Sequence, residues 1–277
     1  MNWLQRVMIG FVSGLCEPMP VCAEAHRSLL RYFFGLSAIE PLFLLACHTA
    51  ALIVVLSVGR LEMYRLWRTT KILHTPQRRR TGQANLNQAG TLRLLRIAAA
   101  LTVVGRILSL RLQTVADRLW LLALPLMFTG LLLWLPTHIR TANKDGRHLT
   151  GIDGLMMGLA ALISAVPGIS LVGAVLAIAS MLGIHRHYAV RFAWLLLSAS
   201  LMSSVVMDLL MVVRTGVSFT VSGLIETALA AGSAGVGSWL AIHFIRSRTR
   251  SGWSGISGFC FYNWGMALLC LTLFLLV

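Results

Sequence analysis

Apolar stretches long enough to cross a lipid bilayer recur along this chain, and they constrain its fold more than any other feature. A helix needs roughly 18 or more consecutive apolar residues to span the hydrocarbon core. Such stretches occupy residues 41–59, 119–136, 192–213, 217–245 and 256–277. A weaker one, residues 94–110, carries Arg96 and Arg106. The sequence therefore predicts six transmembrane segments.

Composition and periodicity decide which kind of membrane protein this is. Hydrophobic residues make up 57% of the chain and charged residues only 12%, which leaves too little polar side chain to cover a soluble globule. The apolar stretches are too long for β-barrel strands and do not alternate with period two. Helices also satisfy their own backbone hydrogen bonds in lipid. We expect an all-α integral membrane protein.

Basic residues give the chain a net charge of +15, but they lie between the apolar stretches and not along one face of a soluble domain. This arrangement disfavours a nucleic-acid partner. The positive-inside rule places such clusters in the cytoplasm. The densest cluster, within residues 60–93, predicts a basic cytoplasmic loop.

Two further apolar stretches are interrupted. Residues 3–35 are broken around residues 18–22, and residues 151–184 are broken at Pro167-Gly168. Basic clusters flank residues 151–184 on both sides, so this stretch must enter and leave the membrane on one side. It predicts a re-entrant helix pair, with two full crossings as the alternative.

The N-terminal stretch has a different alternative, a cleaved signal peptide, because Ala23-Glu24-Ala25 is similar to a peptidase site. Glu17 and Pro18, directly after the apolar run, favour a second re-entrant pair instead. Both chain ends then lie outside. The two breaks stand in corresponding halves, residues 1–136 and 151–277 of a single membrane domain 1–277, as an inverted repeat predicts.

Ionisable residues gather around the first break: Glu17, Glu24 and His26. A charge at bilayer depth is costly unless it lines a cavity or has a partner, so these residues indicate a functional site. Half-helix ends at both breaks offer free N–H groups to an anion. The alternatives are a helix cap for Glu17 and a surface ion pair between Glu24 and Arg27.

Three other polar residues lie inside the predicted transmembrane segments: His48, Asp208 and Glu226. Interhelical hydrogen bonding is favoured for them over a role in solute or proton transport.

Three segments carry a resemblance to a known family. Residues 14–26, Gly-Leu-Cys-Glu-Pro-Met-Pro-Val-Cys-Ala-Glu-Ala-His, resemble the first signature of the bacterial undecaprenyl-diphosphate phosphatases of the bacitracin-resistance type. Residues 165–173, Ala-Val-Pro-Gly-Ile-Ser-Leu-Val-Gly, are similar to the second signature. Residues 261–265, Phe-Tyr-Asn-Trp-Gly, are similar to the aromatic stretch before the last helix of that family.

The resemblance implies removal of one phosphate from the carrier lipid undecaprenyl diphosphate at the outer side of the bacterial inner membrane, which recycles the carrier for cell-wall synthesis. It implies a divalent cation, Mg²⁺, held by the family carboxylate at Glu17, and Glu24, where the family has threonine, is the candidate for a second carboxylate ligand. The catalytic residues would be Glu17, Glu24 and His26. The residues implied for head-group binding are Cys22, Arg27, Gly168 and Ser170.

The chain also departs from the family pattern. Ser13 stands at the first family carboxylate, Cys22-Ala23 replace a serine pair, and Leu171 stands where the family has an arginine that grips phosphate. Losing that arginine removes a strong phosphate contact. Glu24 and Arg27 are candidates for compensation. The alternative is a non-catalytic protein that binds or translocates polyprenyl phosphate, and the sequence leaves a homodimer open.

Overall fold

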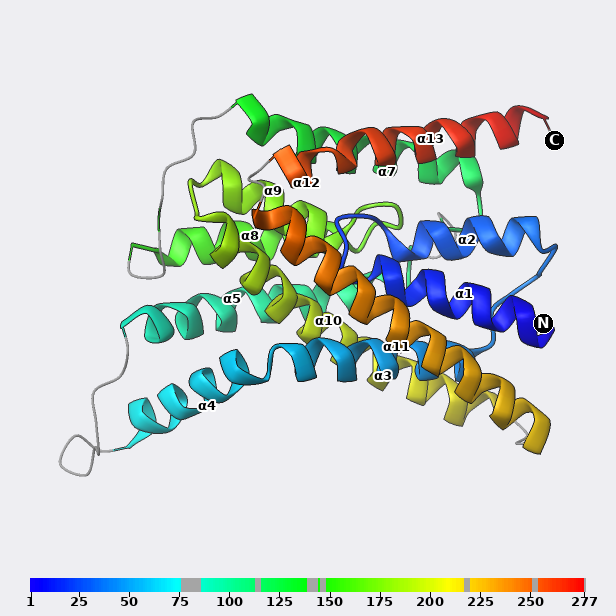
Figure 1. Ribbon diagram of the computed structural model, residues 1–277, viewed down its shortest axis with the longest axis horizontal. Coiled ribbons are helices and arrows are strands. Elements are labelled where there is room, and N and C mark those ends of the chain that lie inside the picture. Colours follow the sequence, from blue (N-terminus) through cyan, green and yellow to red (C-terminus); the bar gives the residue numbers. More distant parts are fainter. Residues whose placement is uncertain are drawn as a thin grey trace.

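The computed structural model of the protein describes residues 1–75, 86–112, 116–138, 144, 148–216, 220–250 and 254–276, and these residues form a bundle of helices (Figure 1). The helices of the first half are α1 (Trp3–Cys16), α2 (Ala23–Phe33), α3 (Pro41–Val58), α4 (Arg60–His74), α5 (Leu86–Ser109), α7 (Leu119–Trp134) and the short η2 (Leu135–His138). Those of the second half are α8 (Gly151–Ile163), α9 (Leu171–Met181), α10 (Arg186–Thr215), α11 (Val221–Arg250), α12 (Ser254–Ser257) and α13 (Phe259–Leu276).

Five of the described helical segments are long and apolar enough to cross a membrane, which confirms a multi-pass, all-α membrane protein. They are α3, α7 with η2, α10, α11 and α13. All but the last residue of the weak stretch 94–110 lie within α5, whose 24 residues would extend about 36 Å at 1.5 Å per residue. Because α5 carries several arginines it is not among the five, and its crossing stays a prediction. Residues 217–219 and 277, the predicted ends of two segments, lie outside the described residues.

Within the predicted cytoplasmic loop of residues 60–93, the described residues are mostly helical: residues 60–74 form α4 and residues 86–93 belong to α5. The cytoplasmic position of this segment stays a prediction. Residues 60–74 contain no proline or glycine, and apolar residues recur along them at helical spacing. Leu66 and Thr69 are buried, and α4 packs against α5. Tertiary contact therefore turns a polar, basic segment into a helix, while residues 76–85 lie outside the described part.

Contacts between helices of the two halves come in matching sets, in which α1, α3 and α11 correspond to α8, α10 and α5. Helix α1 packs along α11 and α8 packs along α5, while α3 contacts α11 and α10 contacts α5. Helices α3 and α10 also contact each other, as do α7 and α13, which lie side by side at one edge of the bundle (Figure 1). An inverted repeat predicts this pattern. The re-entrant course of the short pairs α1–α2 and α8–α9 stays a prediction.

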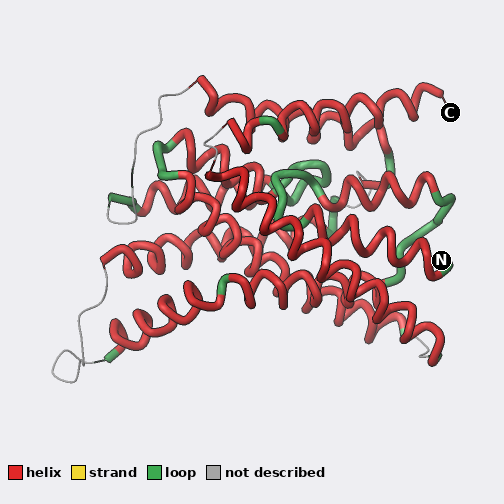
Figure 2. The backbone as a smooth tube through the Cα atoms, in the orientation of Figure 1, coloured by secondary structure: helices red, strands yellow, loops and turns green. Residues whose placement is uncertain are grey.

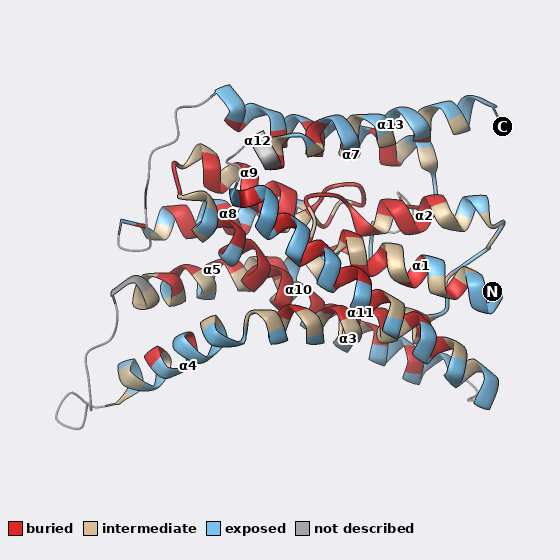
Figure 3. Cartoon of the chain, in the orientation of Figure 1, coloured by how far each residue is buried: buried red, intermediate tan, exposed pale blue. Residues whose placement is uncertain are grey.

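Small residues let α1 approach α11 closely. A Cβ added to Gly14 would collide with the backbone of Ala234, and one on Gly10 would lie 2.6 Å from the carbonyl oxygen of Ala230. The Ser238 hydroxyl donates to the Gly14 carbonyl at 2.9 Å. Packing without a solvent-driven hydrophobic force depends on such close approach. Burial is concentrated in α9, in the first half of α10 and at residues 20–29, whereas long faces of α13 and α4 are exposed (Figure 3).

Candidate functional site where the two breaks meet

The first break, residues 17–22, ends α1 because Pro18 and Pro20 supply no N–H for a helix. Its backbone carbonyls are instead satisfied by side chains from the second half. Trp194 Nε1 donates to the Pro18 carbonyl at 3.2 Å, and Asn263 Nδ2 donates to that of Pro20 at 3.2 Å. Irregular backbone inside a membrane protein requires such internal partners. The first break is therefore held in place by α10 and α13.

The second break, residues 164–170, depends on Gly168. Its φ of +102° is unfavourable for any residue with a Cβ, and a Cβ there would lie 2.7 Å from Cβ of Pro125. The Thr129 hydroxyl on α7 donates to the Gly168 carbonyl at 3.0 Å. The Ser170 hydroxyl accepts from the N–H of Gly173 at 3.1 Å, so Ser170 is the N-cap of α9.

The two breaks touch each other inside the bundle, where Figure 2 shows loop segments surrounded by helices. The N–H of Gly168 donates to Sγ of Cys22 at 3.2 Å, and the Ser170 hydroxyl lies 3.4 Å from the Met19 carbonyl oxygen. Residues about 150 positions apart thus meet, as the sequence pattern predicts.

A cavity of about 80 Å³ lies between the breaks and α5. Among its lining residues are Glu17, Glu24 and Arg27 from the first half and Ser170 from the second break. The interpretation that Glu24 and Arg27 share a site with Glu17 and Ser170 is therefore consistent with the geometry. Arg27 is buried, and among the described residues its ion pair is with Glu17 at 3.3 Å and not with Glu24.

A row of charged and polar side chains continues from Arg27 into the bundle. The Glu17 carboxylate lies 3.7 Å from Nε2 of His48, and Nδ1 of His48 lies 2.6 Å from a carboxylate oxygen of Asp208. His48 is buried on α3, and Asp208 is buried on α10. The predicted interhelical role of His48 and Asp208 agrees with this contact, and the contact also connects them to Glu17.

Glu226 has a separate partner. Its carboxylate lies 2.9 Å from Nε of Arg6, and the same arginine pairs with Glu40 at 2.8 Å. This ion-pair group connects α1, α11 and the start of α3, and none of its members lines the cavity.

Arg106 on α5 also lines the cavity, beside Thr102, Gly105 and Ser109 of the same helix. Its Nε is buried and has no hydrogen-bond partner among the residues that the structure describes. Sequence reasoning did not include Arg106 in the site. The signal in the sequence was an arginine inside an apolar stretch, because a charge at bilayer depth is costly unless it lines a cavity or has a partner.

His26 points away from the cavity. Its Nδ1 is 2.7 Å from the Cys22 carbonyl oxygen, and its Nε2 is 2.6 Å from the Tyr262 hydroxyl, with the two rings stacked at 5.7 Å. His26 is not among the residues that line the cavity. Of the predicted site residues Glu17, His26 and Ser170, Glu17 and Ser170 line the cavity and His26 does not, because α2 turns His26 toward α13. A catalytic role for His26 stays a prediction.

The cation implied by the family resemblance was compared with the donor groups present. Within the described residues no group of three or more His, Cys, Asp or Glu side chains lies close enough to hold a metal ion. The cavity offers the carboxylates of Glu17 and Glu24. Mg²⁺ is commonly held by one or two carboxylates together with substrate phosphates. The residues therefore fit Mg²⁺ only when a phosphate supplies the remaining ligands.

Comparison with known families gives a match over almost the whole chain: residues 6–269 match the model of the bacitracin resistance protein BacA family. This chain belongs to that family. The BacA family match covers both breaks, α5 and most of α13.

Relatives of this BacA family member have similar lengths. An undecaprenyl-diphosphatase from Carboxydothermus hydrogenoformans is 27% identical over 99% of this chain and 98% of its own length. Undecaprenyl-diphosphatase 1 from Shouchella clausii is 26% identical over 90% of this chain and 89% of its own length. Undecaprenyl-diphosphatase 1 from Halalkalibacterium halodurans is 28% identical over 71% of this chain and 73% of its own length.

Proposed function

We propose that this protein hydrolyses undecaprenyl diphosphate to undecaprenyl phosphate and inorganic phosphate. The observation that carries the proposal is the cavity between the two breaks, where two carboxylates and two guanidinium groups converge. Phosphoryl transfer depends mainly on positioning and charge neutralisation, which this set of groups supplies. The names of the full-length relatives support the choice of substrate.

Arg27 and Arg106 bind the diphosphate in this proposal. Both arginines line the cavity, Arg27 from α2 and Arg106 from α5, and the buried Nε of Arg106 has no hydrogen-bond partner among the described residues. Together they replace the arginine that is absent at Leu171. A guanidinium forms short, charge-assisted hydrogen bonds with phosphate oxygens and stabilises the negative charge that develops on the leaving group.

Glu17 orients the attacking water and accepts its proton. The water oxygen forms a bond with the terminal phosphorus, the bond from that phosphorus to the bridging oxygen breaks, and undecaprenyl phosphate leaves. Arg27 and His48 position the Glu17 carboxylate, and Asp208 orients His48 through the 2.6 Å contact. A positioned general base contributes typically about 10²- to 10⁴-fold to a rate.

Glu17 and Glu24 are the residues that would hold a divalent cation together with the diphosphate. Such a cation supplies further neutralisation of the phosphate oxygens. The site faces the outer side of the membrane in this proposal, because the positive-inside rule assigns the basic helix α4 and the start of α10, with Arg186 and Arg191, to the cytoplasm.

Phosphate release from undecaprenyl diphosphate tests the function. The detergent-purified protein is incubated with the lipid and Mg²⁺ beside Glu17→Gln, with Glu40→Gln as the matched control because Glu40 lies in the Arg6 ion pair outside the cavity. We expect release by the wild type and by Glu40→Gln only. Binding of the lipid without release above the Glu17→Gln level would overturn the phosphatase proposal.

A further inference from the structure

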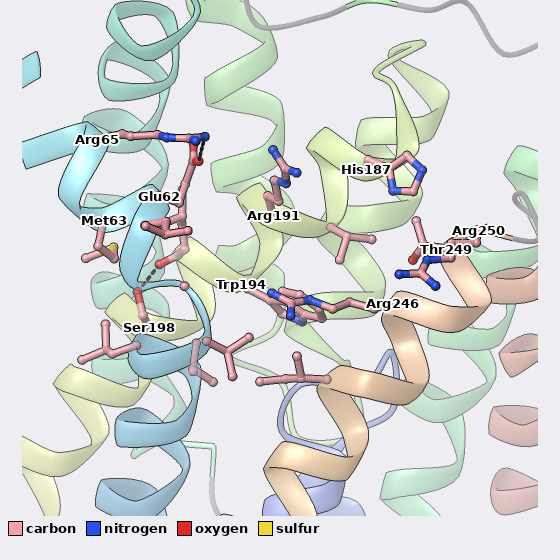
Figure 4. A pocket seen from close by; sticks show the side chains of 18 residues that line it. Glu62, Met63, Arg65, His187, Arg191, Trp194, Ser198, Arg246, Thr249 and Arg250 are labelled. Carbon is pink, nitrogen blue, oxygen red and sulfur yellow. Dashed lines mark hydrogen bonds and ion pairs between the residues drawn. The ribbon is translucent and has the colours of Figure 1, made fainter.

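A second and larger cavity, of about 550 Å³, is separate from the one between the breaks (Figure 4). It is formed by the junction of α3 and α4 at Gly59, by the first half of α10 and by the last part of α11. Two of these elements belong to the first half of the chain and two to the second. None of the residues assigned above to the phosphatase site lines this cavity, which we call the basic pocket.

The basic pocket contains an excess of positive charge. Its arginines are Arg65, Arg191, Arg246 and Arg250, and its single lining carboxylate is that of Glu62. Glu62 lies 3.9 Å from Arg65 and accepts a hydrogen bond from Gln88 at 3.3 Å. In the described part of the chain no carboxylate forms an ion pair with the other three arginines.

The floor of the basic pocket is apolar. Val55, Val190 and Ile242 are buried there, and the Trp194 ring lies 5.6 Å from the guanidinium carbon of Arg246. Figure 4 shows the Arg246 side chain extending from α11 toward Trp194, with Arg191 on α10 beside them. Trp194 also donates to the Pro18 carbonyl, so the same ring separates the basic pocket from the first break.

We propose that the basic pocket binds the phosphate headgroup of an anionic lipid from the cytoplasmic leaflet. Guanidinium groups at the rim match a phosphate, and the apolar floor matches the adjoining hydrocarbon. Basic pockets between transmembrane helices on the cytoplasmic side are suited to such headgroups. A lipid bound here contacts α3 and α4 of one half and α10 and α11 of the other, and therefore holds the two halves together.

Lipid binding is measured by native mass spectrometry of the full-length, detergent-purified protein with phosphatidylglycerol, phosphatidylcholine or inorganic phosphate. The test variant is Arg191→Gln with Arg246→Gln. Its matched control is Arg68→Gln with Arg248→Gln, two exposed arginines on α4 and α11 that do not line the pocket. A basic residue near an anionic lipid headgroup is expected to raise the affinity about fivefold. Removing two of them should therefore weaken phosphatidylglycerol binding about 25-fold.

The control pair should bind phosphatidylglycerol as the wild type does, and phosphatidylcholine should bind much more weakly. Equal binding of the two lipids, or equal effects of the two arginine pairs, would overturn the proposal. Binding of inorganic phosphate as tightly as phosphatidylglycerol would identify a site for a soluble anion and also overturn it.

A second measurement does not depend on the variants folding. A photoreactive phosphatidylglycerol analogue is cross-linked to the wild-type protein, and the labelled peptides are mapped. We expect labels at residues 55–65, 187–198 and 242–250. Labels confined to other segments would contradict the proposal, and neither result depends on phosphatase activity.

Discussion

The two breaks look alike in sequence but have different physical tasks. The first break and the following turn of α2 supply the charged side chains Glu17, Glu24 and Arg27, whereas the second break supplies Gly168, with a positive φ that suits glycine, and the helix cap Ser170. The first is held by donors from α10 and α13, and the second is held by Thr129 of α7 and by Cys22. Under the proposed function, the first break supplies the reacting groups and the second break supplies the scaffold that holds them.

Glu17→Gln should give the largest effect if the first break carries the chemistry. The amide keeps the size of the side chain but cannot accept the proton of water, so phosphate release should fall by about 10²- to 10⁴-fold. The thermal unfolding temperature in detergent should also fall, because the buried Arg27 guanidinium loses its ion pair, so release is compared at a temperature at which both proteins are folded. Activity within about tenfold of the wild type would remove the distinction between the two breaks.

Arg106→Gln tests whether α5, which belongs to neither break, completes the site. Loss of a charge-assisted hydrogen bond of about 1.5–3 kcal/mol should raise KM for undecaprenyl diphosphate about 10- to 100-fold. Arg106→Lys should restore part of that loss, because it keeps the charge without the bidentate geometry. An unchanged KM in both variants would show that the diphosphate does not reach α5.

Gly168→Ala tests the scaffolding role of the second break. The positive φ and the close approach of Pro125 should lower the free energy of unfolding by about 1–3 kcal/mol. Gly232→Ala on α11 is the matched control, since a Cβ there meets no atom within 4 Å. Thermal unfolding in detergent measures both. Equal unfolding temperatures for the two variants would contradict the structural role of Gly168.

Asp208→Asn tests the positioning of Glu17 from a distance. The amide can still accept a hydrogen bond from His48 but loses the charge, so kcat should fall about fivefold with KM nearly unchanged. Steady-state phosphate release measures the two parameters separately. A change in KM alone would mean that Asp208 acts on substrate binding and not through Glu17.

Glu226→Gln should give the smallest effect, because this carboxylate lies outside both breaks. Arg6 keeps its second partner Glu40, and Glu226 is partly exposed, so the free energy of unfolding should fall by about 1 kcal/mol or less. Phosphate release should stay within about twofold of the wild type. A large loss of activity would show that acidic residues outside the breaks also matter for the reaction.

Much of this protein could be predicted from the sequence because bilayer thickness and backbone hydrogen bonding leave few choices. The apolar stretches gave the segments later found as α3, α7, α10, α11 and α13, and the prolines of the first break and Pro167-Gly168 marked both interruptions. The ionisable residues Glu17, Glu24 and His26 marked the region of the site, because charges at bilayer depth are costly. Of these, Glu17 and Glu24 line the cavity and His26 does not. The motifs indicated the BacA family before the match over residues 6–269 showed it.

Tertiary structure alone decided which side chains share the cavity. Arg106 lines the same cavity as Glu17 because α5 passes the breaks. His26 does not line this cavity because α2 turns its ring toward Tyr262. The contact of His48 with Asp208 joins residues 160 positions apart, and no local pattern encodes it. Helical periodicity fixes which residues share a face of one helix, but only the packing of helices fixes which faces meet.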